Sequence, residues 1–299
     1  MASARPPQRG GWALGVAQTV ENLVDDVARR LGTPPDSVPE ARDLIAALLD
    51  VPRHWPLLRE NKWVDSSVWQ RACAAADARA RGAPLAYAVG QASFRALTLV
   101  VDGRVLIPRP ETELLVDLVL ERCAPGGVAV DVGTGSGAIA LSLALEGRFD
   151  RIVATDLSLD ALEVARENAR RLAPGAVEFL HGDLLRPVAG GGLRAVVSNP
   201  PYVSYDEIAA LPGSVRDWEP PVALFSGRHG LDATARLVRQ AGGALEPGGL
   251  LALEVDATRA SLVAELVASD ARFDEVTVKL DLAGRERFVL ARRVPEDRT

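Results

Sequence analysis

The strongest constraint on the fold is an alternation of apolar, β-branched runs with segments of helical length, from about residue 111 to the end of the 299-residue chain. Nearly continuous apolar runs such as VAVDV are typical of strands that helices cover on both faces. The alternation predicts βαβ units in an α/β fold, with a doubly wound, mostly parallel seven-stranded sheet. The last two strands lie close together in the sequence, so we expect them to be antiparallel. The expected strands are 128–132, 151–156, 177–180, 194–199, 249–255, 275–280 and 286–291, and the expected helices between them are 137–146, 158–172, 231–245 and 258–268.

The beginning of the chain has a different pattern. Residues 1–11 are rich in Pro, Gly and Arg, and we expect a disordered tail there. Apolar residues then recur at helical spacing over 20–31, and two more helices are expected at 40–50 and 67–81. The sequence therefore predicts a small helical domain over 12–90.

A third pattern connects these two parts. In FRALTLVVDGRVLI, Asp102-Gly103 stands between two apolar, β-branched runs. Asp-Gly in such a setting is a strong signal for a hairpin turn. We expect a β-hairpin linker over 91–110, followed by the α/β domain over 111–299.

Composition excludes several classes of protein. Two cysteines cannot build a disulfide scaffold, and three histidines without metal-ligand spacing exclude a zincin, so no metal site is expected. No apolar run approaches the ~20 residues of a membrane span, and no secretion signal is seen, so we expect a cytoplasmic protein without membrane contact. The net charge of −6 argues against a broad nucleic-acid surface. Residues 1–95, with 12 basic and 10 acidic side chains, suit a protein partner better than a phosphate backbone.

A glycine-rich turn follows the first expected strand of the sheet and precedes a helix. Glycine permits a sharp turn and a close approach of a ligand, and a helix N-terminus offers unpaired N–H groups. At the carboxyl end of a central strand, this pattern predicts a cofactor site. The spacing is G-x-G-x-G, and Asp131 before the turn would repel a pyrophosphate, so the turn resembles that of class I S-adenosylmethionine (SAM) methyltransferases. The residues of the turn are Gly133, Thr134, Gly135, Ser136 and Gly137.

Acidic residues follow the next two strands. Asp156 ends the second strand, where a carboxylate can accept both hydroxyls of a ribose, in SAM and NAD alike. Asp183 follows the third strand and could accept from an adenine amino group, while Leu184 packs against the ring. The alternatives are a residue near a helix cap for Asp156, although Ser158 is the better cap, and a solvated loop acid for Asp183.

The fourth strand ends in Asn199-Pro200-Pro201-Tyr202. Two prolines stiffen the backbone and lack N–H groups, so Asn199 Oδ1 and the Pro200 carbonyl can form a rigid pair of acceptors. Tyr202 adds an aromatic face beside them. This arrangement fits a planar NH2 group, whose nitrogen would be oriented toward a methyl donor rather than activated by a strong base. The alternative is a simple end of a strand.

Taken with these motifs, the chain resembles the release-factor glutamine N5-methyltransferases, the PrmC/HemK family, over nearly its whole length past residue ~40. The stretch Ile-Pro-Arg-Pro-Glu-Thr-Glu is specific to that family, whereas Asn-Pro-Pro-Tyr also occurs in DNA adenine and RNA guanine N-methyltransferases. The motifs that carry the resemblance are Pro84–Tyr87 with Gly90, Arg104–Glu113, Asp131–Gly137, Asn199–Tyr202 and Asp281–Arg287.

The resemblance implies a Rossmann-like class I methyltransferase domain over 111–299 and a substrate-docking role for the helical domain. It implies methyl transfer from SAM to the side-chain amide of the glutamine in the Gly-Gly-Gln motif of bacterial class 1 release factors, by a monomer. Asn199, Pro200 and Tyr202 would be catalytic. SAM would contact Gly133, Thr134, Gly135, Ser136, Gly137, Asp156, Asp183, Leu184 and Asn199, and the glutamine would contact Asn199, Pro200, Pro201, Tyr202, Arg109 and Glu111.

Two of these residues have other interpretations, and two positions depart from the family pattern. Arg109, between two prolines, is also explained as a loop arginine, and Glu111 is largely explained by the helix start at Pro110. Asp256 stands where relatives often have Gly, and Arg259 stands about where they have Gln. We expect these departures to touch the sheet edge of the site and not the line of methyl transfer.

Other functions are considered beside this one. The first alternative is an N-methyltransferase for an exocyclic amino group of a nucleic-acid base, which would need a basic groove that is not apparent. An NAD(P) oxidoreductase would leave Asn199–Tyr202 without a role. A binding module without catalysis would not need that motif intact.

Overall fold

The computed structural model describes residues 18–32 and 35–295, which fold as two compact units that divide between Val89 and Gly90. In this described part, no helix is long and apolar enough to cross a membrane. The first unit contains α1 (Val20–Leu31), α2 (Val38–Leu49), α3 (Trp55–Leu58), α4 (Ser66–Ala80) and α5 (Leu85–Val89). The second unit has the strands β1 (Gln91–Phe94), β2 (Leu97–Val100), β3 (Val128–Val132), β4 (Arg151–Asp156), β5 (Val177–His181), β6 (Leu193–Ser198), β7 (Leu245–Glu254), β8 (Phe273–Leu280) and β9 (Glu286–Arg293). Its helices are α6 (Pro110–Arg122), α7 (Ala138–Glu146), α8 (Leu159–Leu172), the 3-10 helix η1 (Tyr205–Ala210), α9 (Gly213–Arg216), α10 (Pro221–Leu224), α11 (Asp232–Ala244) and α12 (Ala260–Ala268).

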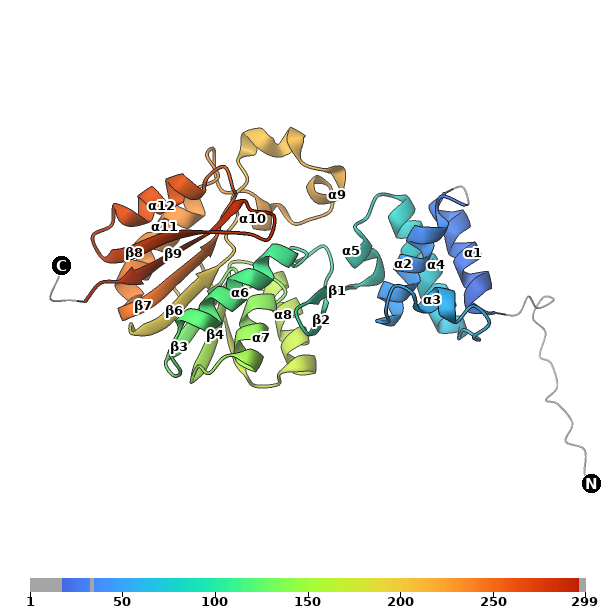
Figure 1. Ribbon diagram of the computed structural model, residues 1–299, viewed down its shortest axis with the longest axis horizontal. Helices are drawn as coiled ribbons and strands as arrows, with labels where there is room; N and C mark the ends of the chain where they lie inside the picture. Colours follow the sequence, from blue (N-terminus) through green and yellow to red (C-terminus); the bar gives the residue numbers. More distant parts are fainter. Residues whose placement is uncertain (1–17, 33–34, 296–299) are drawn as a thin grey trace, which may run out of the picture. The chain divides into compact units, whose positions relative to one another are not determined.

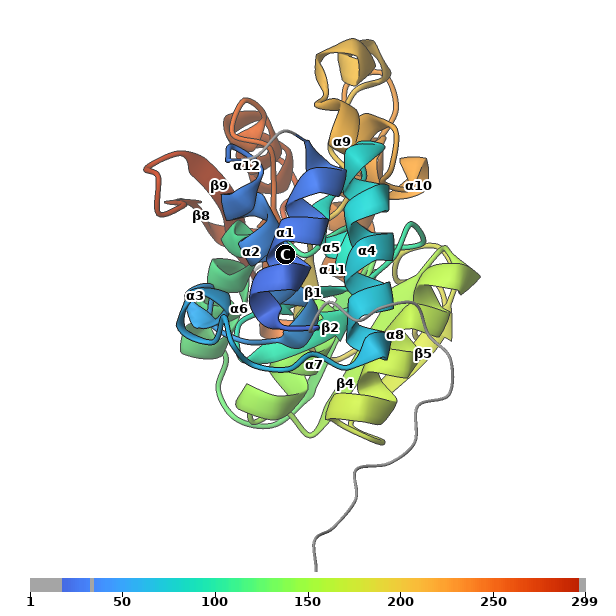
Figure 2. The same ribbon diagram turned by 90° about the vertical axis from the view of Figure 1, so that its right-hand side faces the viewer.

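The helical unit is built around α1. The side chains at the predicted spacing, from Val20 to Val27, are buried against α2 and α4. Helix α4 presents alanines to this core, which lets α1 and α4 run closely side by side (Figures 1 and 2). The expected tail over 1–11 lies outside the described residues, and the domain limits at 12, 90 and 110 stay predictions.

The second unit contains the predicted seven-stranded sheet, in the order β5-β4-β3-β6-β7-β9-β8. Strands β3 to β7 are parallel, and β9 is antiparallel to both β7 and β8, which confirms the expected final pair. Helices α6, α7 and α8 cover one face and α11 and α12 the other (Figure 1). The strand order reverses direction between β3 and β6, the position where doubly wound sheets bind ligands.

A hairpin lies within the predicted range 91–110, but its turn and its strands differ from the prediction. β1 pairs with β2 around Arg95-Ala96, and Asp102-Gly103 lies after the hairpin. Arg95 has a left-handed backbone (φ 52°) without being glycine, and it is held there by its N–H donating to Glu113 (2.9 Å) and by its guanidinium pairing with Glu146. Tertiary contacts therefore fix a turn that local propensity does not favour.

Candidate active site

Two loops meet where the sheet order reverses. β3 and β6 pair Val132 with Ser198, so Gly133 and Asn199 leave neighbouring strands at the same edge. The Ser198 hydroxyl donates to the Val132 carbonyl (2.7 Å) and joins the two strand ends. The predicted cofactor turn and the predicted substrate corner are therefore adjacent, as the α/β topology requires.

The glycine turn is held by backbone hydrogen bonds. The N–H groups of Gly133 and Thr134 both donate to the Thr155 carbonyl (2.9 and 3.0 Å), and the Gly135 N–H donates to Asp156 Oδ2 (2.9 Å). Gly133 and Gly135 have left-handed backbones (φ 73° and 54°), and a Cβ at either position would meet no atom within 4 Å. The turn therefore leaves open space in front of its backbone.

Three other residues of the predicted cofactor site, Thr134, Ser136 and Gly137, contact the interior of the protein and stabilise the turn. Thr134 donates its hydroxyl to Asp131 (2.6 Å), and the Ser136 carbonyl accepts from Asn168 (3.0 Å). At Gly137 (φ 86°) a Cβ would press on Leu141 and Ala165, where α7 and α8 meet. The structure thus places Thr134, Ser136 and Gly137 away from the cavity wall described next.

Asp131 is wholly buried beneath this turn. It accepts from Thr134 and from the Ala140 N–H (3.1 Å), and its Oδ1 has no partner among the described residues. Burial raises the pKa of Asp131 to about 7. The carboxyl group therefore supports the loop and does not face the cavity.

The open space in front of the turn belongs to a cavity of about 480 Å³. The carboxyl ends of β3, β4, β5 and β6 form its wall, with Gly133, Asp156, Leu184 and Asn199 among the lining residues. This volume is typical of sites for ligands the size of a nucleoside derivative. We call it the donor cavity.

The donor cavity has carboxylate groups that suit the ribose and the adenine of a SAM molecule. The carboxylate of Asp156 accepts the N–H groups of Gly135 and Ser158 (2.9 Å each), and carboxylate oxygens have further lone pairs for ribose hydroxyls. Leu184 has a left-handed backbone (φ 55°), a strained conformation that places it on the wall. The expected Asp183 also lines the cavity, but its Oδ2 pairs with Arg236, which leaves Oδ1 for a ligand.

A second, smaller cavity of about 190 Å³ lies beside the Asn-Pro-Pro-Tyr corner. Pro200 and Tyr202 line it, whereas Pro201 lines the donor cavity. Asn199 lines both cavities, as do Leu106 and Ala223. We call the smaller space the acceptor cavity, and Asn199 stands at the wall that the two share.

The acceptor groups at this corner are available. Asn199 donates its Nδ2 to Thr112 (3.2 Å), and none of the described residues donates to its Oδ1 or to the Pro200 carbonyl. Burial raises the pKa of Tyr202 to about 12, so its phenol stays neutral at physiological pH. The corner therefore has two acceptor oxygens without a donor among the described residues and a neutral aromatic ring.

The two predicted residues before α6 have different surroundings. Arg109 lines the acceptor cavity, and its Nη2 pairs with both oxygens of the buried Glu219 (2.7 and 2.8 Å). Burial raises the pKa of Glu219, and Arg109 counteracts the rise. Glu111 lines neither cavity and pairs with Arg285 (3.3 Å), so the structure does not bring it to the site.

The sequence is closely similar to curated enzymes of one kind. It is 41% identical to a release factor glutamine methyltransferase of Moorella thermoacetica, over 93% of this chain and all of the relative. It is 40% identical to the release factor glutamine methyltransferase of Deinococcus radiodurans, over 88% of this chain and 94% of the relative. The chain belongs to the release factor glutamine methyltransferase family. Models of the PrmC N-terminal domain and the methyltransferase small domain match residues 22–90 and 110–211.

A solved structure agrees with the fold of this family. A methyltransferase from Pyrococcus furiosus superimposes with a TM-score of 0.52 at 21% identity, covering 67% of this chain and 90% of that one. The likeness concerns the class I methyltransferase fold of the sheet unit. The predicted fold class is therefore confirmed. That the protein is a methyltransferase follows from its relatives of about 40% identity.

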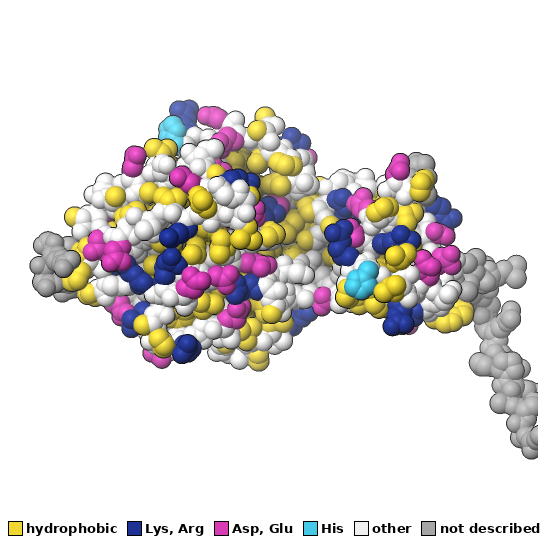
Figure 3. Space-filling model, in the orientation of Figure 1, with side chains coloured by type: hydrophobic (Ala, Val, Ile, Leu, Met, Phe, Trp, Pro, Cys, Tyr) yellow, Lys and Arg dark blue, Asp and Glu magenta, His cyan; other side chains and the backbone are white. Residues whose placement is uncertain are grey.

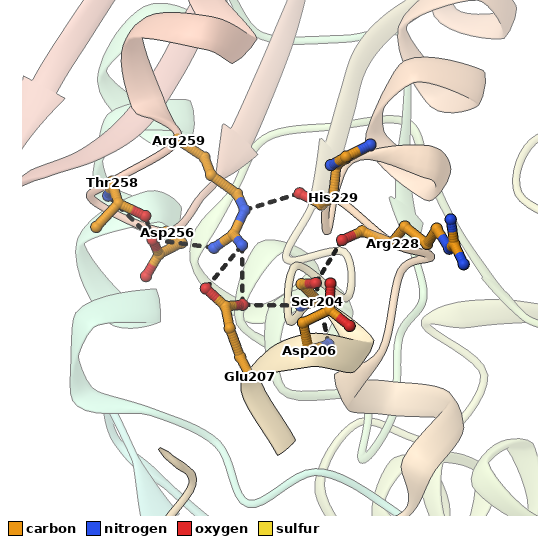
Figure 4. Close-up of polar contacts among 8 residues, drawn as sticks. All are labelled: Ser204, Asp206, Glu207, Arg228, His229, Asp256, Thr258 and Arg259. Atoms are coloured by element: carbon orange, nitrogen blue, oxygen red, sulfur yellow. Dashed lines mark hydrogen bonds and ion pairs between the residues drawn. The ribbon is translucent and has the colours of Figure 1, made fainter. Parts of the chain in front are cut away.

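The two departures from the family pattern form a side-chain cluster outside both cavities (Figure 4). Arg259 pairs with both oxygens of Glu207 (2.9 and 2.8 Å) and with Asp256 (3.3 Å), and its Nε donates to the His229 carbonyl (2.9 Å). Glu207 also accepts from the N–H of Ser204 (2.9 Å), two residues after Tyr202. The cluster therefore fastens the segment that continues the Asn-Pro-Pro-Tyr corner to the end of β7.

Three polar residues around the site escaped the sequence analysis. Thr112 and Glu254 lie next to Asn199, and Asn168 joins α8 to β2 through the Val100 backbone (2.7 and 3.0 Å). All three are buried polar side chains on otherwise apolar faces. That is the signal by which the sequence could have revealed them, because buried polar groups require partners.

Proposed function

We propose that this protein transfers a methyl group from SAM to the side-chain amide nitrogen of a glutamine. The observation that supports the proposal is the position of Asn199, which lines both the donor and the acceptor cavity. A donor in one cavity and an amide in the other would meet at this side chain. Transfer between two bound groups gains most of its rate from such orientation.

The donor side would hold SAM through the backbone of Gly133 and Gly135, with Asp156 accepting from the ribose hydroxyls. Leu184 and Asp183 would contact the adenine. When bound, SAM supplies a methyl group that a sulfonium centre makes electrophilic. Thr134, Ser136 and Gly137 would act indirectly, by holding the shape of the turn.

The acceptor side would orient a weak nucleophile. An amide nitrogen has a delocalised lone pair, and Asn199 Oδ1 and the Pro200 carbonyl would each accept one of its two N–H groups. These acceptors stabilise the positive charge that develops on the nitrogen as it is methylated. Tyr202, being neutral, would pack against the amide plane and would not remove a proton. The nitrogen then loses one proton toward the acceptors and solvent.

The substrate would be the glutamine of the Gly-Gly-Gln motif in bacterial class 1 release factors. Pro201 and Arg109 would form walls of the site, whereas Glu111 lies outside both cavities. The helical unit would dock the release factor, and the enzyme would work as a cytoplasmic monomer. On the face drawn in Figure 3, Lys and Arg side chains are interspersed with Asp and Glu, which suits a protein partner better than a nucleic acid.

Mass spectrometry tests this proposal. A class 1 release factor incubated with the enzyme and SAM should gain about 14 Da on the glutamine of its Gly-Gly-Gln peptide, and Asn199→Ala should slow this gain by about 10²-fold or more. If the release factor stays unmodified and the methyl group of labelled SAM is found in added RNA or DNA instead, the nucleic-acid alternative is supported. No transfer to either substrate would contradict the proposal.

A further inference from the structure

We infer that Thr112 and Glu254 act as positioning residues, holding the amide of Asn199 in the only orientation that can accept an N–H from the substrate. The inference rests on the proposed methyl transfer at Asn199. The three residues come from distant parts of the chain but converge at one edge of the sheet. β6 and β7 pair Ser198 with Leu253, so Asn199 and Glu254 follow on neighbouring strands, and Thr112 reaches them from the first turn of α6.

The three side chains form a hydrogen-bonded series. Asn199 donates Nδ2 to Thr112 Oγ1 at 3.2 Å, and Thr112 donates its hydroxyl to Glu254 Oε2 at 2.6 Å. Thr112 is 4% exposed and Glu254 is 1% exposed. Water therefore does not compete for these bonds, and the series decides which groups are donors.

Proton counting fixes the direction of the series. An ionised carboxylate only accepts, so Glu254 takes the single hydroxyl proton of Thr112. The threonine oxygen then has only lone pairs left for Asn199, which must present its NH2 group. Asn199 Oδ1 is thereby turned away from Thr112, with no donor on it among the described residues. If the amide of Asn199 were flipped, its Oδ1 would face the lone pairs of Thr112 Oγ1. Its NH2 group, which cannot accept a hydrogen bond, would then face the cavity.

Glu254 is set in a mixed electrostatic environment. The pKa of Glu254 is raised to about 7, chiefly by burial and to a smaller extent by Glu111 at the start of α6, while the hydrogen bond from Thr112 lowers it. Arg287 on β9 and Arg109 before α6 also lower this pKa. Tyr202, whose own pKa is raised partly by Glu254, is neutral in this range.

Protonation of Glu254 would reverse the series. A carboxylic acid can donate to the Thr112 oxygen, which frees the threonine proton for Asn199 Oδ1. The amide then has no preferred orientation. The ionised form is the productive one, so turnover should be complete above the pKa and should fall as the pH drops through about 7.

The first test replaces the hydroxyl group. Thr112→Val keeps the shape but removes both bonds, and we expect kcat to fall about tenfold while the SAM Kd stays within about twofold. Thr112→Ser restores the hydroxyl and should recover most of the turnover. Thr234→Val, at a buried position of α11 that lines neither cavity, is the matched control.

The second test uses pH. With saturating SAM, kcat of the wild type should fall between pH 8 and pH 6, and Glu254→Gln should remove that fall because glutamine does not titrate. The 15N–1H signals of the Asn199 side-chain amide, assigned by their loss in Asn199→Asp, provide a readout that needs no turnover. They should titrate near pH 7 in the wild type and stay constant in Glu254→Gln.

These results separate the inference from the proposed function. If the wild type methylates a release factor but Thr112→Val matches it, or Glu254→Gln keeps the fall in kcat at low pH, the positioning role is wrong. If the wild type transfers no methyl, the proposed function fails, and the amide signals alone decide whether the series holds Asn199. Signals that do not respond to pH in the wild type would overturn the inference.

Discussion

The glycine turn after β3 and the Asn-Pro-Pro-Tyr corner after β6 leave the same edge of the sheet, yet different groups hold them. The turn is fixed by its own backbone, through N–H bonds to Thr155 and Asp156. The corner depends on side chains from α6 and β7 that are far away in the sequence. The contact of Gly135 with Asp156 spans 21 positions of the sequence, whereas that of Asn199 with Thr112 spans 87. Mutations should therefore affect donor binding at the first region and turnover at the second.

The largest effect is expected at the corner. Asn199→Ala removes one of the two proposed acceptors, and kcat should fall by about 10²–10³-fold, the loss typical for a group that stabilises developing charge. The SAM Kd should change much less, because the glycine turn remains. Steady-state kinetics with a release factor, together with calorimetry for SAM, measure both quantities. If Asn199→Ala has the kcat of the wild type, the assignment of turnover to the corner is wrong.

The glycine turn should show the opposite behaviour. Gly133→Ala places a methyl group on a left-handed backbone facing the donor cavity, and the SAM Kd should rise about tenfold. Gly175→Ala is the matched control, because its φ of 79° and its open surroundings are the same but it lies outside the cavity. Both variants should lose about 1 kcal/mol of stability from the backbone strain. Equal SAM affinities in the two variants would exclude the turn as the donor site.

The buried carboxyl group of Asp131, beneath the glycine turn, makes the stability of that region depend on pH. Burial raises the pKa of Asp131 in the folded protein to about 7 from its ordinary value of 3.8, so the folded protein keeps a proton that the unfolded chain has released. The stability that this proton provides is complete at low pH and is lost as the pH rises through 7. In Asp131→Asn, the melting temperature should fall less between pH 5 and pH 8 than in the wild type. If the melting temperatures of the two proteins fall by the same amount between pH 5 and pH 8, this account is contradicted.

The smallest effect is expected at the cluster of Figure 4. Arg259→Ala frees Glu207 and loosens the segment beyond Tyr202, so kcat should fall only about two- to fivefold with the SAM Kd unchanged. Arg216→Ala, which breaks an exposed pair with Asp217, serves as the control. A loss as large as that of Asn199→Ala would place Arg259 in the catalytic machinery, contrary to the structure.

The sequence predicted the parts of the fold that local patterns determine. The limits of β3 and β4 match the predicted strands, and the glycine turn and the corner stand where their motifs place them. The hairpin turn was mispredicted because Arg95 is held by acidic residues of α6 and α7. The run after Asp102-Gly103 does not pair as a strand, because Arg104, Val105 and Leu106 line the donor cavity instead.

The side-chain contacts of the site were beyond prediction from local patterns. Thr112 is 87 positions before Asn199 and 142 before Glu254, so no spacing rule connects them. The same limit explains Glu111, which the family motif places at the site but which pairs with Arg285. A motif identifies the residue types, and the tertiary fold decides which of them reach the cavity.

A crystal structure with S-adenosylhomocysteine and a Gly-Gly-Gln peptide tests the central claim most directly. The account predicts the sulfur atom in the donor cavity and the glutamine nitrogen in the acceptor cavity, within hydrogen-bond distance of Asn199 Oδ1 and the Pro200 carbonyl. A glutamine bound elsewhere, or a sulfur atom that the Asn199 side chain separates from the amide nitrogen, would contradict it.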